Sequence, residues 1–144
     1  MTAPFPFEGA SLLPHSGHAR FVDEVLEFGN DALVCVGRIP AENPFARDGM
    51  VPGFVLVELA AQAAAIEALA RIGDDVPQPR VGYLVRARGL HWIASGVLAG
   101  APLTVSVRRE DSIPPLYMYR AKVTLEGAEV FGGRFSIYVD DESG

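Results

Sequence analysis

The residues best suited to chemistry lie on one long apolar segment, PGFVLVELAAQAAAIEALARIG, which begins at Pro52. Glu58 stands among apolar neighbours there, and Gln62 follows it by four positions, on the same face of a helix. Because burying an unpaired carboxylate is costly, Glu58 must face a partner or a cavity, or stay protonated. Such a carboxyl group is suited to general acid–base catalysis. The alternative is an ion pair with an arginine at a dimer interface.

Gly53 and Phe54 open the same apolar segment. The first backbone N–H groups of a helix have no partner inside it, and they suit the carbonyl oxygen of an acyl group. Every helix offers such donors, so Gly53 and Phe54 indicate a binding site only because Glu58 follows about one turn further on. We expect Gly53, Phe54 and Gln62 to bind a substrate, with the Gln62 amide orienting the Glu58 carboxylate or contacting the ligand.

Three histidines are candidates for exchanging a proton with Glu58, since imidazole titrates near neutral pH. His15 ends the segment LLPH, His18 follows three residues later, and His91 lies in HWI. A single histidine is more often structural than catalytic. We favour His15 as the catalytic partner over His18 and His91.

Two further residue types bear on partners and cofactors. Arg86 and Arg88 are two apart in a predicted strand and therefore face the same way, as a basic patch for an acidic or phosphorylated partner would require. A solvated strand face, or salt bridges to the surplus acids, explains them equally well.

Cys35 is the only cysteine, so no internal disulfide or cysteine-based metal cluster can form, and its alternating apolar neighbours predict a core position. We expect neither a metal nor an organic cofactor.

The elements that position these residues follow from periodicity. A helix is predicted from Pro52 to about Ile72, with proline at its start and Gly73 at its stop, and it is apolar nearly all round, so other structure must wrap it. An irregular loop, Ala41–Val51, leads into it. Turn residues stand at Gly29–Asp31, Gly96–Gly100, Ile113–Pro115 and Gly127.

Six segments have the alternation, or the Val, Tyr and Phe content, of strands. They are Arg20–Phe28, Ala32–Ile39, Val81–Ile93, Pro102–Glu110, Leu116–Glu126 and Val130–Val139. Two strands, one long helix and four further strands predict an α+β protein in which a curved antiparallel sheet wraps one central helix. This layout is typical of the hot-dog fold, and we expect residues 1–144 to form a single domain.

Composition limits the partners. With 144 residues, 49% hydrophobic and 21% charged, the chain has the profile of one ordinary globular domain. A net charge of −6 disfavours broad binding to nucleic acid or anionic membranes. The N-terminus resembles no signal peptide, and no uncharged run reaches the roughly 18 residues of a membrane span. We therefore expect a cytoplasmic protein with no nucleic-acid or membrane partner.

Several segments together resemble the FabZ-type 3-hydroxyacyl-acyl-carrier-protein dehydratases, in the family's order and over most of the chain. They are LLPH, FVDEVLE, NPF at Asn43–Phe45, VPGFVLVELAAQ at Val51–Gln62, VGYLVRARGLHW and GAPLTVSV. The resemblance implies that Glu58 is the catalytic acid, that the Gly53 amide holds the thioester carbonyl, and that Gln62 is the glutamine of the central helix. It also implies a homodimer, or a heterodimer with a related hot-dog subunit.

One departure from that family concerns the catalytic histidine. The family carries it in a GHFPG segment, whereas here the loop reads ARDGMVPG, and the equivalent position by ungapped counting is Pro44. The shortened loop resembles a divergent, ApeP-like branch of predicted dehydratases, some encoded with aryl-polyene-type pathways. His15 is then the nearest replacement, with Asp48 a weaker one.

Three functions follow from the resemblance. The first is a dehydratase acting on a 3-hydroxyacyl thioester of acyl carrier protein or coenzyme A in fatty-acid or aryl-polyene-type biosynthesis, with Arg86 and Arg88 meeting the acidic carrier. The second is a non-catalytic partner subunit of an active hot-dog dehydratase. The third is an acyl thioesterase in which Glu58 activates water.

Overall fold

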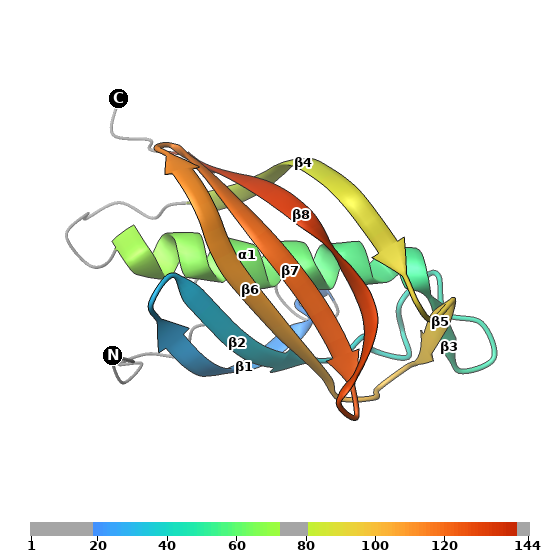
Figure 1. Ribbon diagram of the computed structural model, residues 1–144. Coiled ribbons are helices and arrows are strands. Elements are labelled where there is room, and N and C mark those ends of the chain that lie inside the picture. The colour runs from blue at the N-terminus through green and yellow to red at the C-terminus, as the bar shows by residue number, and fades with distance from the viewer. Residues whose placement is uncertain (1–18, 73–80, 141–144) are drawn as a thin grey trace.

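One helix packs against a curved sheet in the computed structural model, which describes residues 19–72 and 81–140. The helix, α1 (Leu56–Ile72), lies behind six antiparallel strands in the order β1-β2-β6-β7-β8-β4 (Figure 1). The strands are β1 Val22–Gly29, β2 Ala32–Gly37, β4 Val81–Trp92, β6 Leu103–Ile113, β7 Leu116–Leu125 and β8 Ala128–Asp140. The predicted α+β layout is confirmed.

Helix α1 is the centre of the core, as its all-round apolar sequence predicts. It contacts each of the six strands of the large sheet, and Leu56, Leu59 and Ile66 are fully buried. By length and composition Gly53–Arg71 would suffice to cross a membrane, but 78% of that window is buried inside the protein. Its apolar surface is therefore used for packing against the sheet.

The start of the helix differs from the prediction. Residues Met50–Pro52 form a short strand, β3, which pairs with β5 (Gly96–Leu98) in a separate two-stranded ribbon. A 3₁₀ turn, η3 (Gly53–Val55), follows, and the α-helix begins only at Leu56. We expected a loop before Pro52 and a turn at Gly96. Strands of three residues are too short to show a period of two, so the sequence could not reveal them.

The Asn30–Asp31 turn and the burial pattern agree with the sequence. Asn30 and Asp31 both have positive φ, 54° and 63°, as a two-residue type I′ hairpin turn requires. Alternate residues of β2, β6 and β7 are buried against α1, while the others face outward. Cys35 is fully buried as predicted, and burial, with a smaller effect of Asp23, raises the pKa of its thiol to about 12. The sheet thus has an apolar inner face and a polar outer face.

Candidate active site

Glu58 lies in the first turn of α1 and lines a cavity of about 240 Å³ between the helix and the beginning of β4. Its side chain is half-buried, which is less burial than its apolar sequence neighbours predicted. The cavity lies beside Glu58 as a catalytic carboxylate requires. The described residues that line it are Glu58, Ala61, Gln62, Ala65, Val81, Gly82, Tyr83 and Leu84.

Gln62 fixes the geometry on one side of this cavity. Its Nε2 donates to Oε1 of Glu58 at 3.2 Å and to the carbonyl oxygen of Ala19 at 2.7 Å. Its Oε1 accepts the backbone N–H of Phe21 at 2.8 Å, and the side chain is only 1% exposed. Since all its contacts are made at once, the amide has one orientation. The expected contact between Gln62 and Glu58 is present, and the same amide holds the chain that enters β1.

Gly53 does not offer the free donor that we expected. Its N–H donates to the carbonyl oxygen of Ser95 at 2.8 Å, and its own carbonyl accepts Nε1 of Trp92 at 2.7 Å. A Cβ at this position would lie 2.7 Å from Cδ1 of Trp92, so only glycine fits here. The β3–β5 ribbon causes this, because it brings Ser95 against the turn. Phe54 remains the candidate amide, although neither residue lines the Glu58 cavity.

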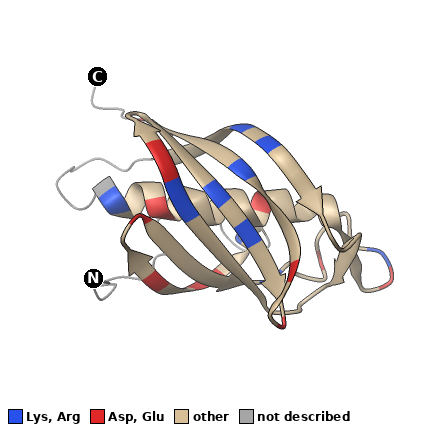
Figure 2. Cartoon of the chain, in the orientation of Figure 1, with Lys and Arg blue, Asp and Glu red and all other residues tan. Residues whose placement is uncertain are grey.

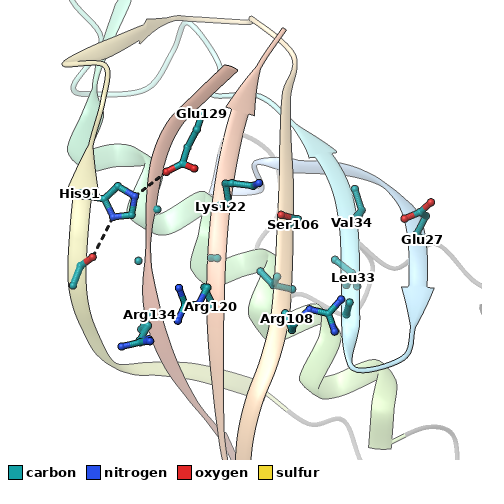
Figure 3. A pocket seen from close by; sticks show the side chains of 16 residues that line it. Glu27, Leu33, Val34, His91, Ser106, Arg108, Arg120, Lys122, Glu129 and Arg134 are labelled. Carbon is teal, nitrogen blue, oxygen red and sulfur yellow. Dashed lines mark hydrogen bonds and ion pairs between the residues drawn. The ribbon is translucent and has the colours of Figure 1, made fainter. Parts of the chain in front are cut away.

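Of the three candidate histidines, the structure describes only His91. His15 and His18 lie outside the described residues. His91 is on the outer face of the sheet, where its Nε2 lies 2.8 Å from Oε2 of Glu129 (Figure 3). That hydrogen bond, with a second to the carbonyl of Gly89, raises the pKa of His91. His91 therefore cannot serve Glu58, which lies on the inner side.

Arg86 and Arg88 also lie on the outer face. They pair in register with Ser136 and Arg134 of β8, and both are exposed. They share one side of β4 as predicted, but they do not line the Glu58 cavity. Any carrier that they contact would bind the sheet from outside.

Among residues 19–72 and 81–140 the fully buried carboxylate is Glu67, which stands nine positions after Glu58 in the same apolar segment and was not among the candidate site residues. It is 0% exposed, and its Oε1 accepts the hydroxyl of Tyr119 at 2.7 Å. The Arg71 guanidinium, one turn further on, holds both of its oxygens. Burial, reinforced by the Glu67 charge, raises the pKa of Tyr119, so this hydroxyl stays a donor. In the sequence, Arg71 four positions after Glu67 was the available sign that this carboxylate has an ion-pair partner on its own helix.

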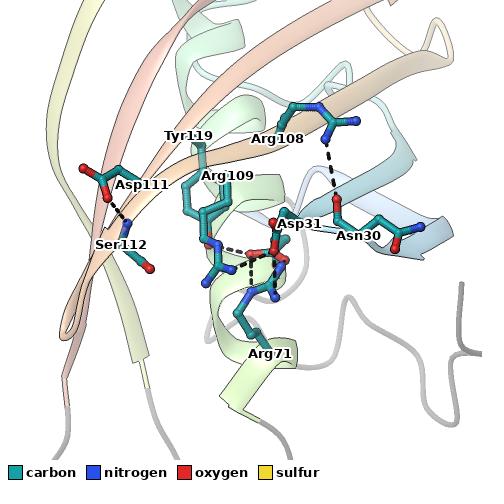
Figure 4. Close-up of polar contacts among 9 residues, drawn as sticks. Asn30, Asp31, Arg71, Arg108, Arg109, Asp111, Ser112 and Tyr119 are labelled. Carbon is teal, nitrogen blue, oxygen red and sulfur yellow. Dashed lines mark hydrogen bonds and ion pairs between the residues drawn. The ribbon is translucent and has the colours of Figure 1, made fainter. Parts of the chain in front are cut away.

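This buried group extends into a network that joins four elements (Figure 4). Arg71 Nη1 lies 3.2 Å from Oδ1 of Asp31 in the β1–β2 turn, and Nη2 of Arg109 on β6 lies 2.7 Å from the same oxygen. Because Tyr119 and Arg71 engage its oxygens, Glu67 is a structural group. Among the described residues, no cluster of three or more His, Cys, Asp or Glu suits a metal ion.

Comparison with solved structures defines the class. A chain of the dehydratase heterocomplex ApeI:P from Xenorhabdus doucetiae superimposes with a TM-score of 0.82 at 17% identity, covering 95% of this chain and 93% of that chain. A hypothetical thioesterase from Streptococcus pneumoniae TIGR4, solved with coenzyme A, gives a TM-score of 0.62 at 16% identity, covering 84% of this chain and 88% of that chain. The fold is therefore the hot-dog fold of dehydratases and thioesterases, as predicted.

Sequence comparison gives the family. The profile of the ApeP-like family, described as ApeP dehydratase, matches residues 7–143. An uncharacterized thioester dehydrase from Halalkalibacterium halodurans is 25% identical over 129 residues, which cover 85% of this chain and 81% of the relative. The chain belongs to the ApeP-like dehydratase family, and the resemblance read from its motifs is confirmed.

Proposed function

We propose that the chain is a hydro-lyase that removes water from a 3-hydroxyacyl group held as a thioester on acyl carrier protein or coenzyme A. The observation that carries this proposal is the cavity beside Glu58 in a member of a dehydratase family. Apolar side chains supply much of its wall, and Glu58, Gln62 and the hydroxyl of Tyr83 are its polar side-chain groups. A few polar groups in an apolar pocket are typical of ligand sites.

The proposed reaction needs two proton transfers. His15 takes the proton from C2 of the acyl chain, and the carboxylic acid of Glu58 gives its proton to the departing 3-hydroxyl, so that water leaves and the C2–C3 double bond forms. The N–H of Phe54 polarises the thioester carbonyl. Return of the proton from the His15 imidazolium to the Glu58 carboxylate, through water, restores both groups.

The chain connectivity supports His15 as the base. Gln62 holds the carbonyl of Ala19, and Gln62 also contacts Glu58. His15 precedes Ala19 by four residues, a length of chain that spans at most about 14 Å. His15 is therefore within reach of the Glu58 cavity by chain length alone.

The exposed edge strand β4 is an argument that the active form contains a second subunit. β4 ends the described strand order, and it carries exposed apolar side chains at Tyr83 (48%), Leu84 (38%) and Val85 (56%). The Glu58 cavity lies beside the beginning of the same strand. A second copy, or a related hot-dog subunit, that added a strand to β4 would cover these side chains and close the cavity.

A product assay tests the proposal. The purified protein is incubated with a 3-hydroxyacyl thioester of acyl carrier protein, and mass spectrometry follows the enoyl thioester and the free acid. Enoyl product from the protein alone is the expected result. Its formation should depend on Glu58 and His15, and the Glu24→Gln variant, which changes an exposed glutamate of β1, is the matched control. Enoyl formation that survives His15→Ala would remove His15 from the mechanism.

The other products separate the alternatives. Free acid without enoyl product would contradict the dehydratase proposal and indicate a thioesterase. If this chain gives no enoyl product alone but raises the rate of an active hot-dog dehydratase above the rate of that enzyme alone, the chain is a partner subunit. The loop ARDGMVPG, which lacks the histidine of related enzymes, is the observation that favours this second candidate.

A further inference from the structure

The outer face of the sheet is strongly basic, although the chain carries a net charge of −6. Lys and Arg residues lie across β4, β6, β7 and β8, the strands in front of α1 (Figure 2). Four exposed arginines stand in register on these strands: Arg108 is opposite Arg120, Arg120 opposite Arg134, and Arg134 opposite Arg88. We call these four residues the arginine row. At a strand spacing of about 4.8 Å, the row is roughly 14 Å long.

The centre of the arginine row is neutralised within the protein. Glu110 Oε2 lies 3.2 Å from Nε of Arg120, and its Oε1 lies 3.1 Å from Nε of Arg134. The two ends differ. The side chain of Arg88 makes no ion pair or hydrogen bond within residues 19–72 and 81–140, and that of Arg108 makes there only a 3.5 Å contact to the carbonyl of Asn30. Like charges opposite one another on a sheet are unfavourable, so the two ends, which Glu110 does not contact, would be stabilised by a bound anion.

The surface beside the row is hollowed rather than flat. A depression of about 770 Å³ is lined by three of the four arginines and by Lys122 (Figure 3). Its floor includes the small residues Ala32, Ser106 and Gly132. A Cβ on Gly132 would lie 2.7 Å from Cε1 of His91, so glycine is needed for the imidazole to lie there. The low floor lets the backbone of a partner approach between the long basic side chains.

We propose that the arginine row docks an acidic α-helix of a partner protein, with carboxylates two turns apart contacting Arg88 and Arg108. Two turns of helix measure about 11 Å, slightly less than the roughly 14 Å of the arginine row. The long arginine side chains can bridge this difference. Glu27 and Glu129 line the same hollow, where they would repel a uniform polyanion such as nucleic acid. A helix can place neutral side chains against these two acids. The inference does not depend on catalysis at Glu58, which lies on the inner side.

A peptide-binding measurement tests this docking. The probe is a labelled alanine-rich helical peptide with glutamates four residues apart along one face, and the control probe carries glutamine at the same positions. Fluorescence anisotropy with the full chain should detect only the glutamate peptide, with an affinity that falls as salt rises. Arg88→Gln should weaken binding about threefold to fivefold, the effect of one exposed ion pair. The double variant with Arg108→Gln should weaken it more than tenfold.

The controls make the result decisive. Arg38→Gln removes an exposed arginine outside the row, paired with Asp23, and should leave binding unchanged. Arg88→Gln should keep or raise the melting temperature, because it relieves repulsion from Arg134, whereas a structural arginine would lower it. Equal binding of both peptides, no binding of the glutamate peptide at millimolar concentration, or unaltered binding by Arg88→Gln overturns the proposal. So does tighter, Arg88-dependent binding of a single-stranded oligonucleotide or of tripolyphosphate.

Discussion

Replacing Glu67 with alanine is the sharpest test of how this core is held together. The carboxylate is 0% exposed and accepts hydrogen bonds from Tyr119 and Arg71. Without it the Tyr119 hydroxyl, itself buried, loses its acceptor, and within the part of the chain that the structure describes Arg71 keeps only its contact with Asp31. Breaking a buried pair by removal of one partner costs about 3–5 kcal/mol.

That cost translates into a measurable melting shift. At about 2.1 cal/mol/K per residue, unfolding a chain of 144 residues has an entropy near 0.3 kcal/mol/K, so each kcal/mol moves the midpoint by roughly 3 °C. We expect Glu67→Ala to lower the melting temperature by about 10 °C or more in calorimetry. Urea unfolding should give the matching loss of free energy.

Two variants show whether the loss comes from the buried network. Glu110 also holds two arginines, but its side chain is exposed to solvent, so Glu110→Gln should cost no more than about 1 kcal/mol. In a double-mutant cycle, Glu67→Ala and Tyr119→Phe should be non-additive by at least about 1 kcal/mol, since the residues share a hydrogen bond. A loss for Glu67→Ala as small as that of Glu110→Gln, or additive effects in the cycle, would refute the reasoning.

Three further outcomes are expected from the structure. Gly53→Ala should displace the Trp92 ring, which a Cβ would approach to 2.7 Å, and a red-shifted, more solvent-exposed Trp92 fluorescence would report it. NMR titration should give His91 a pKa above 6.5 that returns toward 6.5 in Glu129→Gln. Because the folded pKa is raised, the stabilisation from His91 is fully present below pH 6.5 and is lost as pH rises through the raised value. Cys35, with a pKa of about 12, should resist thiol reagents at pH 8 until the protein unfolds.

The fold was largely predictable because its main elements have strong, long patterns. The apolar helix, the alternating strands and the Asn30–Asp31 turn each carry a local signal that the structure repeats. The β3–β5 ribbon carries no such signal, since each strand has only three residues. Its consequence for Gly53, whose N–H is bound by Ser95, therefore depends on a long-range pairing that periodicity does not reveal.

The candidate site was predictable in part for a different reason. Glu58 and Glu67 lie on the same apolar helix, nine residues apart, which places them on opposite sides at 100° per residue. Local sequence shows both as carboxylates among apolar neighbours. Only the tertiary packing decides that Glu67 meets Tyr119 on β7 while Glu58 meets a cavity at β4. The motif around Glu58, rather than its apolar neighbours, singled out the carboxylate that lines a cavity.

The arginine row on the outer face also depends on tertiary packing that the local sequence does not reveal. Arg86 and Arg88 were visible as a pair within one strand, but the register that aligns Arg88 with Arg134, Arg120 and Arg108 joins four different strands. A pattern within one strand carries no information about its neighbours in the sheet. Cross-strand charge rows of this kind emerge only once the sheet is assembled.

Enoyl formation by the Glu58→Gln variant tests the central claim most directly. The substitution keeps the size of the side chain and its place beside Gln62 but removes the acidic carboxyl proton, so the fold and melting temperature should be retained. Since general acid–base catalysis typically contributes about 10²–10⁴ in rate, the account predicts a loss of at least about a hundredfold in turnover of a 3-hydroxyacyl thioester. Turnover within a few-fold of the unaltered protein would contradict it, because Glu58 would then not be the catalytic acid.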